Sequence, residues 1–313
     1  MQVIRGLHNL PNDWSACAMT IGNFDGLHLG HQQLLAACVA SAKHLNVPAV
    51  LVTFEPYPKA FFSKDKKVPR LMGLRDKVLA LQDKGIDYLC VLPFNAALAE
   101  LPAEQFVLDI LLDRLKMLSV VVGDDFRFGA RRTGDFSLIE KLSATHHFEA
   151  TQLKTFLHAD ERVSSSRLRA ALHEGDLDLA RQLQGHDYQL SGCVVSGDQR
   201  GRAFGYPTAN IYVSQPYLPF AGIFVVRIDG LGDVSLRGVA SVGKRPMYPT
   251  KRDVLEVFLL DFNQKIYGEH LTVTFLHKLR DEVNFESEAA LVAQIEKDVA
   301  ETQRYFMCNS PSP

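Results

Sequence analysis

The sequence lacks several features that would point to particular classes of protein. No apolar run approaches the ~18 residues that cross a membrane, and no basic stretch followed by an apolar core opens the chain. A formal net charge of −2 offers none of the basic surface that nucleic acid requires. The five cysteines are odd in number and never form a C-x-x-C pair, which favours free thiols. We therefore expect a cytoplasmic enzyme with small-molecule substrates and no membrane or nucleic-acid partner. These features do not indicate an oligomeric state.

The first half of the 313-residue chain alternates between two hydrophobic periods, and the length favours two domains. Strand-like runs occur at 16–21, 48–54, 87–92, 118–122 and 148–153, and helical patterns lie near 32–44, 73–84, 102–116 and 136–145. Alternating strands and helices predict a parallel sheet with both faces covered. Ligands of such sheets bind beyond the carboxyl ends of the strands.

The second half changes to short strand-like runs separated by glycine and proline. These runs lie at 190–195, 208–213, 222–228, 234–242, 254–260 and 271–276. Their spacing is typical of an antiparallel barrel or sandwich. An amphipathic pattern over about 287–305 predicts a final helix, and we expect the tail that follows to be frayed.

The most informative stretch lies between Thr20 and His31 and reads Thr-Ile-Gly-Asn-Phe-Asp-Gly-Leu-His-Leu-Gly-His. It joins a predicted strand to a predicted helix, so unpaired backbone N–H groups and a positive helix end meet at one spot that suits an anion. His28 and His31 can donate hydrogen bonds or carry charge, as negative charge developing on phosphorus requires. A surface pair or a metal site is the alternative, but no Cys, Asp or Glu follows His31 at metal spacing.

Two further loops of the first half fall at the same predicted rim of the sheet. They are Phe54-Glu-Pro-Tyr-Pro58, stiffened by two prolines, and the glycine-bounded segment from Gly123 to Gly129. The segment Val163-Ser-Ser-Ser-Arg-Leu-Arg169 then enters a helical pattern. Serines at a helix start are first of all caps, yet capping needs only one hydroxyl. Three hydroxyls with Arg167 and Arg169 favour a triphosphate clamp in addition to capping.

Two stretches of the second half carry chemical groups. Thr208 and Asn210 stand two apart in an extended segment, so their oxygens share one side and suit Mg²⁺ together with phosphate oxygens. A polar turn leading into a strand explains the same two residues without a ligand. Glu256 lies in the apolar run Val254–Leu260, where burial of an ionised group is costly and raises the pKa, as a general base requires. A glutamate at a strand edge or barrel mouth is the alternative.

Taken together, these motifs make the chain resemble the bacterial bifunctional riboflavin kinase/FAD synthetase family nearly end to end. The resemblance rests on six segments in the family's order: 22–31, 54–58, 123–129, 164–169, 205–210 and 256–261. It implies an FMN adenylyltransferase domain over 1–184, a riboflavin kinase barrel over 185–307 and a tail over 308–313. The implied co-substrate is ATP, the metal is Mg²⁺, and riboflavin, FMN and FAD are substrates or products.

The resemblance also implies roles for individual residues. The implied catalytic residues are Glu256, His28 and His31. Thr208 and Asn210 match the family's motif for binding the metal and phosphate. The implied flavin-binding residues are Pro56, Pro58, Phe62, Asp125, Phe128 and Arg280, although Asp125 stands where some members have Asn. The implied ATP-binding residues are Gly22, Asn23, Phe24, Asp25, Gly26, His28, His31, Ser164, Ser165, Ser166, Arg167, Arg169, Gly201, Arg202, Gly205 and Pro207.

The expected function is therefore phosphorylation of riboflavin to FMN, followed by adenylylation of FMN to FAD. Two alternative functions stay open. The first is a nucleotidylyltransferase with another acceptor, such as phosphopantetheine or nicotinamide mononucleotide, which leaves the barrel half unexplained. The second is a non-catalytic flavin-binding protein, which needs neither Glu256 nor the two histidines.

Overall fold

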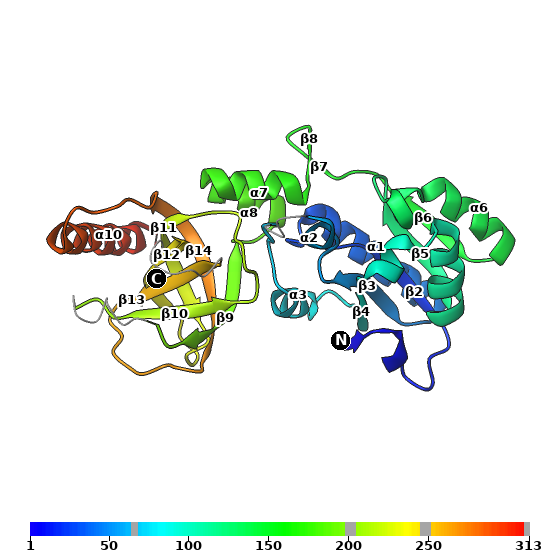
Figure 1. Ribbon diagram of the computed structural model, residues 1–313, viewed down its shortest axis with the longest axis horizontal. Helices are drawn as coiled ribbons and strands as arrows, with labels where there is room; N and C mark the ends of the chain where they lie inside the picture. Colours follow the sequence, from blue (N-terminus) through cyan, green and yellow to red (C-terminus); the bar gives the residue numbers. More distant parts are fainter. Residues whose placement is uncertain (64–67, 198–204, 245–251, 310–313) are drawn as a thin grey trace. The chain divides into compact units, whose positions relative to one another are not determined.

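The computed structural model describes residues 1–63, 68–197, 205–244 and 252–309 (Figure 1). The chain folds into two compact units. The first, here the sheet unit, comprises residues 1–68 and 77–164; the second, the barrel unit, comprises 69–76 and 165–313. Residues 69–76 are thus an excursion of the chain out of the sheet unit, and helix α3 (Leu74–Leu81) begins in one unit and ends in the other.

The sheet unit is built on a six-stranded sheet in the order β1-β4-β3-β2-β5-β6, in which every described pair is parallel. Its strands are β1 (Gln2–Arg5), β2 (Cys17–Ile21), β3 (Ala49–Glu55), β4 (Tyr88–Pro93), β5 (Met117–Gly123) and β6 (Glu149–Leu153). The chain moves outward from β2 to β3 and β4, then returns to the other side of β2 with β5. The carboxyl ends of β2 and β5 therefore flank the switch point at which such sheets bind ligands.

Helices cover both faces of this sheet. They are α1 (Leu29–Leu45), α2 (Pro58–Phe62), α4 (Ala96–Glu100), α5 (Ala103–Gln105), the π-helix η2 (Phe106–Arg114) and α6 (Phe136–His146), with 3-10 turns η1 (Leu7–Asn9) and η3 (Ala130–Arg132). Met19 and Val120 pack with residues of η2 and α6 in the main apolar cluster. Ser119, on the opposite face of β5, accepts a hydrogen bond from Ser41 of α1 at 2.7 Å. A small hairpin, β7 (Leu157–His158) and β8 (Glu161–Arg162), completes the unit.

The barrel unit is a closed barrel in the order β10-β13-β12-β11-β14-β9, with antiparallel neighbours. Its strands are β9 (Gln189–Val195), β10 (Thr208–Val213), β11 (Gly222–Asp229), β12 (Leu236–Lys244), β13 (Asp253–Leu259) and β14 (His270–Arg280). Alternate residues of each strand point inward, where Phe220, Phe224 and Phe275 pack edge to face. The opposite residues of β10, β12 and β13 form an outer face on which polar groups stand.

Helices α7 (Ser165–Glu174), α8 (Leu177–Gln184) and α10 (Glu288–Asn309) belong to the barrel unit. Helix α10 packs against β11 and β12 (Figure 1). The excursion 69–76 is fixed by Tyr188, whose hydroxyl donates to the Leu71 carbonyl at 2.6 Å. Asp76 accepts a hydrogen bond from the Ser191 N–H of β9 at 3.0 Å. These hydrogen bonds explain why eight residues from the first half of the chain belong with the barrel.

The predicted fold class is confirmed: a parallel α/β sheet precedes an antiparallel barrel that ends in a helix. Each predicted strand and helix has a counterpart within a few residues. The pattern over 102–116 resolves into α5 and the π-helix η2, and α10 continues through Cys308 to Asn309, two residues into the expected tail. Residues 310–313 lie outside the described part of the chain.

Candidate active sites

The glycine-rich segment forms a tight turn between β2 and α1 at the switch point of the sheet unit. Phe24, Gly26 and Leu27 all adopt left-handed backbone conformations, with φ of 45°, 85° and 40°. Only Gly26 takes this conformation without steric cost. The two left-handed apolar residues are held in place by burial, since Phe24 and Leu27 are each 1% exposed. The conformation of the turn is therefore fixed by the packing of Phe24 and Leu27.

The two histidines of the turn stack on each other. Their ring centroids are 3.6 Å apart with an interplanar angle of 17°, and the Phe24 ring lies 4.7 Å from that of His31. His28 is also the N-cap of α1, because its Nδ1 accepts a hydrogen bond from the His31 N–H at 3.3 Å. Burial, followed by the neighbouring His28 and Lys77, lowers the pKa of His31 well below its usual value. His31 is consequently neutral at pH 7.

The turn contains two buried polar atoms without hydrogen-bond partners in the described part of the chain, Nδ1 of His31 and Oδ1 of Asn23. Burying an unpaired polar atom costs on the order of 1–3 kcal/mol, so such atoms call for an explanation. A bound nucleotide at the start of α1 would supply partners for both.

Lys77 of α3 lies directly behind the turn and was not singled out from the sequence. Its side chain is 1% exposed, and Nζ donates to the Asn23 carbonyl at 2.7 Å and to Oγ1 of Thr53 at 3.1 Å. The sequence did hold a signal, because Lys77 and the buried Leu81 are four residues apart in a predicted helix. A lysine on the apolar face of a predicted helix indicates a buried cation, because lysine is almost never fully buried without a partner.

Aromatic side chains gather where β3 and β4 end. Phe94, which follows β4, lies 5.9 Å from Phe54, 5.4 Å from Phe61 and 5.7 Å from Phe62 between ring centroids, in edge-to-face geometry. Phe62 is 65% exposed, an unusual exposure for a phenylalanine. Phe94 is the member that sequence reasoning missed, although its position just beyond a predicted strand placed it on the rim.

The other predicted flavin residues of the sheet unit differ in exposure. Pro56 and Asp125 are exposed and Pro58, the first residue of α2, is half-buried. Asp125 forms an ion pair with Arg162. Phe128 is 8% exposed and packs against Phe106 and Phe126. Most of the Phe128 surface is thus already used in the apolar core, and its flavin contact stays a prediction.

The neighbouring Asp124 fixes the loop after β5. Burial acts to raise its pKa, but two hydrogen bonds from Thr155, both 2.8 Å, and the charge of Arg162 lower the pKa overall. The carboxylate therefore stays ionised and ties this loop to the segment after β6.

The serine- and arginine-rich segment begins helix α7, as expected. Ser164 closes the sheet unit, and residues from Ser165 onward belong to the barrel unit. The guanidinium of Arg169 donates to the Pro69 carbonyl at 3.1 Å and to the Ser165 carbonyl at 3.2 Å. Arg167 is half-buried and Ser166 is exposed. The triphosphate clamp of this segment stays a prediction.

The polar residues of the barrel unit meet on the outer face of three neighbouring strands. Asn210 of β10 pairs with Glu256 of β13, which pairs in turn with Ser241 of β12. Two register positions away, and so on the same face, Thr208 pairs with Phe258. Directly opposed residues of antiparallel strands have Cβ atoms about 4.5–5.5 Å apart on the same face. The structure therefore brings Glu256 to Thr208 and Asn210, from which it is at least 46 residues away in the sequence.

Glu256 occupies a different setting from the one expected. The buried face of β13 carries Leu255, Val257 and Leu259, whereas Glu256 is half-buried on the opposite face. Ser241, which only the strand register could reveal, lies beside it. Glu256 is thus neither fully buried among apolar side chains nor at a strand edge, because it lies in the middle of β13, which is paired on both sides in the closed barrel.

Two of the predicted ATP-binding residues of the barrel, Gly201 and Arg202, lie outside the described residues. Gly205 and Pro207 are exposed just before β10, and Gly205 has a φ of 84° with open space where a Cβ would stand. Tyr206 between them packs edge to face on Phe258 at 5.3 Å. This segment thus leads the chain onto the same outer face as Glu256.

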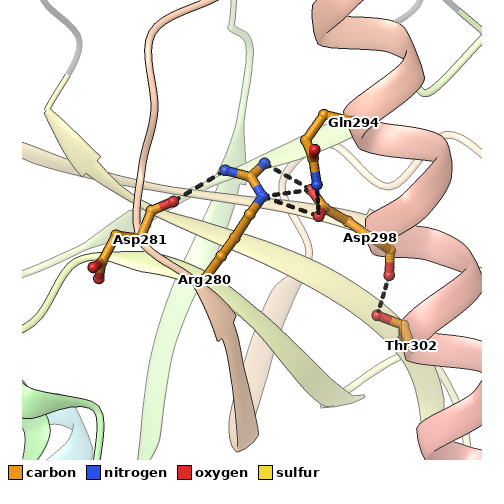
Figure 2. Close-up of polar contacts among 5 residues, drawn as sticks. All are labelled: Arg280, Asp281, Gln294, Asp298 and Thr302. Carbon is orange, nitrogen blue, oxygen red and sulfur yellow. Dashed lines mark hydrogen bonds and ion pairs between the residues drawn. The ribbon is translucent and has the colours of Figure 1, made fainter.

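Arg280 is held by helix α10. Its Nε and Nη2 bind the Asp298 carboxylate at 3.0 and 2.7 Å, and Nη1 donates to the Asp281 carbonyl at 3.0 Å (Figure 2). Gln294 donates to the same carboxylate at 3.0 Å, and the Thr302 hydroxyl donates to the Asp298 carbonyl. The predicted flavin residue Arg280 therefore has a structural partner, and sequence reasoning missed Asp298.

Comparisons with known proteins decide the family. Residues 10–167 match the FAD synthetase family and residues 184–306 match the riboflavin kinase family. The chain belongs to the bifunctional riboflavin kinase/FMN adenylyltransferases. It is 40% identical to the member from Escherichia coli strain K12 over 100% of both chains, and 39% identical to that from Haemophilus influenzae over 98% of this chain and 99% of the other. The predicted family is confirmed, and both enzymatic domains are present.

A solved structure adds support for the fold. The crystal structure of a protein from Streptococcus pneumoniae named as a macrolide-efflux protein has a TM-score of 0.80 at 29% identity and covers 96% of this chain and 98% of that one. Among the helices that the present structure describes, none has the length and apolarity to cross a membrane.

Proposed function

We propose that the barrel unit phosphorylates riboflavin with ATP to give FMN, and that the sheet unit adenylylates FMN with a second ATP to give FAD and pyrophosphate. The observation that carries this assignment is the pairing of Asn210 with Glu256 across β10 and β13. It sets a carboxylate beside neutral oxygen donors in one half of the chain. The turn at the switch point of the other half presents imidazoles and backbone amides, with its acid, Asp25, buried to 3% exposure.

In the kinase reaction the nucleophile is the terminal ribityl hydroxyl of riboflavin. Glu256 accepts the hydroxyl proton while the oxygen attacks the γ-phosphorus of ATP and ADP leaves. A positioned base of this kind contributes typically ~10²–10⁴-fold. We propose that Ser241, which pairs with Glu256 across β12 and β13, orients the carboxylate.

Thr208 and Asn210 fit Mg²⁺ by the chemistry of their oxygens. Mg²⁺ is commonly held by few protein ligands together with phosphates and waters. In the described part of the chain no cluster of three or more His, Cys, Asp or Glu residues could hold a metal on its own. We therefore propose that Thr208 and Asn210 bind Mg²⁺ jointly with ATP. When bound, the ion neutralises charge on the phosphates.

In the transferase reaction the attacking group is the FMN phosphate, which is largely ionised at neutral pH because its second pKa is about 6. No base is required, so the site has to align two anions and neutralise charge at the α-phosphorus. His28, His31 and the amides from Gly22 to Gly26 are proposed to do this. Ser164 to Arg169 hold the remaining phosphates, and pyrophosphate leaves.

For the flavin, we propose that the exposed aromatic cluster around Phe62, with Pro56, Pro58 and Asp125, receives the isoalloxazine ring of FMN. The exposed Phe62 edge supports this role because aromatic pairs are worth about 0.5–1.5 kcal/mol beyond burial. In the barrel, Arg280 is proposed to approach riboflavin while it stays paired with Asp298.

Product chromatography tests both reactions in one protein. Purified protein with ATP and Mg²⁺ is supplied with riboflavin in one reaction and FMN in another. FAD from both substrates is the expected result. FAD from FMN alone would leave the barrel as a flavin-binding module, and no conversion of either would favour a nucleotidylyltransferase with another acceptor.

We also propose a reducing, cytoplasmic location. Cys17, Cys38 and Cys90 are free and buried, and burial raises the pKa of Cys38 and Cys90 to about 12. Buried neutral thiols suit a compartment without disulfide formation. Fractionation of cells with detection of the protein in the soluble cell extract would test this.

A further inference from the structure

The buried lysine behind the nucleotide-binding turn is not explained by folding alone. Lys77 is 1% exposed, and removing an ammonium group from water costs several kcal/mol unless its partners compensate. A methionine or leucine at this position would fill the space without that cost. The group is nevertheless present, and it makes contacts of 2.7 and 3.1 Å with the turn and with the strand beside it.

The first contact fixes the orientation of one peptide in the turn. Nζ of Lys77 binds the carbonyl of Asn23, which belongs to the same planar peptide as the N–H of Phe24. Because the C=O and N–H of a trans peptide point in opposite directions, a carbonyl held toward Lys77 directs the Phe24 N–H away from it. Within the described residues, this N–H donates to no acceptor. A phosphate bound at the turn would supply the acceptor that this N–H lacks.

The second contact ties this peptide to the sheet. Oγ1 of Thr53, on the central strand β3, binds the ammonium group and lies 3.5 Å from the Asn23 carbonyl. The backbone that these bonds hold is strained, since Phe24 adopts a φ of 45°. Conformations of this kind persist only where the surroundings fix them, and they concentrate at functional sites. Lys77 joins the turn, β3 and α3 at this point.

The position also places the ammonium group of Lys77 behind the proposed phosphate site. Burial and His28 lower the pKa of the His31 imidazole, and Lys77 is close enough to His31 to lower this pKa further. Nδ1 of His31 and Oδ1 of Asn23 are both buried without a hydrogen-bond partner among the described residues. A fixed charge in a dry site acts on the transition state without reorganisation, which is the most effective form of electrostatic stabilisation.

We propose that Lys77 is a positioning residue for adenylyl transfer: its buried ammonium group orients the Asn23–Phe24 peptide and sets the electrostatic potential of the turn that receives the ATP phosphates. This proposal rests on the proposed transferase function of the sheet unit. On this proposal, helix α3 influences the chemistry of the site through the peptide that Lys77 holds.

Steady-state kinetics of the full-length protein tests the proposal, with FAD formation from FMN as the readout and riboflavin phosphorylation as an internal reference. We expect Lys77→Met to lower kcat for FAD formation by about 100-fold, the effect of losing one preorganised donor, with a smaller change in the KM for ATP. The conservative variant Lys77→Arg keeps the cation and should recover at least about a tenth of the wild-type kcat. Riboflavin kinase activity should not change in either variant.

The matched control is Lys84→Met, which removes an exposed lysine shortly after the same helix, 3.5 Å from Oε1 of Gln32. It should leave both activities unchanged. If Lys77→Met fails to fold, Lys77→Gln replaces it, because an amide can still donate to the Asn23 carbonyl but carries no charge. It should lower kcat by about tenfold or more.

Several results would overturn the proposal. One is a kcat for FAD formation within about threefold of wild type in the Met or Gln variant. Another is a loss in Lys77→Arg as deep as that in Lys77→Met, and a third is a loss that appears wholly in the KM for ATP. Failure of the transferase assignment itself is distinguishable, because the wild-type protein would then form no FAD from FMN.

Discussion

The two units solve the problem of phosphate chemistry with different structural means. In the sheet unit the proposed reactive groups stand on a turn and the first residues of a helix, where burial, His28 and Lys77 lower the pKa of His31. In the barrel unit Glu256, Asn210 and Ser241 stand on the outer face of regular strands, where the register alone brings them together. The first site is built from donors, and the second contains a carboxylate able to accept a proton. A nucleophile that is already ionised needs the former, and a neutral hydroxyl needs the latter.

The largest expected effect separates the two sites at Glu256. Glu256→Gln keeps the size of the side chain but removes the base, so riboflavin phosphorylation should fall by about 10²–10⁴-fold. FAD formation from supplied FMN should be unaffected. Parallel assays of the two half reactions measure both rates. Loss of FAD formation from FMN in a folded variant would contradict the division of labour between the units.

A somewhat smaller effect is expected at His28, which combines a cap with a proposed catalytic role. His28→Asn retains a side-chain acceptor for the His31 N–H, so the start of α1 should stay intact. FAD formation should nevertheless fall by about 10²–10³-fold, because the imidazole donor is lost. His28→Ala loses the cap as well and should lower the unfolding temperature further. Equal activity of the Asn variant and the wild type would reduce His28 to a capping residue.

The surroundings of His28 and Glu256 show which structural features the sequence could reveal and which it could not. The strand-turn-helix around His28 and the alternation around Glu256 are local patterns, and both placed their residues in the right elements. Strand β1 was missed because Gln2–Arg5 is a four-residue edge strand with only Ile4 buried. The pairing of Ser241 with Glu256 depends on register, which no local pattern specifies. The return of residues 69–76 to the barrel depends on tertiary bonds of Asp76 and Tyr188.

A third prediction concerns stability rather than chemistry and applies to the barrel unit. Asp298→Ala removes the carboxylate of α10 that pairs with the Arg280 guanidinium. Breaking a buried ion pair in this way lowers the free energy of unfolding by on the order of 3 kcal/mol. Thermal unfolding monitored by circular dichroism should show a lower transition temperature for the barrel, and the KM for riboflavin should rise if Arg280 also approaches the flavin. The control is Asp281→Ala, whose exposed carboxylate pairs with Lys278 and should affect the unfolding temperature much less, because water screens an exposed ion pair.

The smallest expected effect is a pH dependence specific to the sheet unit. His31 has a lowered pKa in the folded protein because of burial, His28 and Lys77, whereas the unfolded chain binds a proton near pH 6.5. Between these pKa values the unfolded state binds more protons, so stability falls as the pH is lowered through about 6.5. His31→Gln removes this titration. The difference in unfolding temperature between pH 7.5 and pH 5.5 should therefore be smaller in His31→Gln than in the wild type.

The same group links protonation to nucleotide binding. A triphosphate beside His31 favours the charged imidazole, so ATP binding slightly below neutral pH should be accompanied by proton uptake. Isothermal titration calorimetry in buffers of different ionisation enthalpy measures this uptake, which should be reduced in His31→Gln. Glu256→Gln serves as the control, since it alters only the barrel site. Equal uptake by wild type and His31→Gln would mean that the ATP charge does not reach the turn, and the contrast between a donor site and a base site would then need another basis.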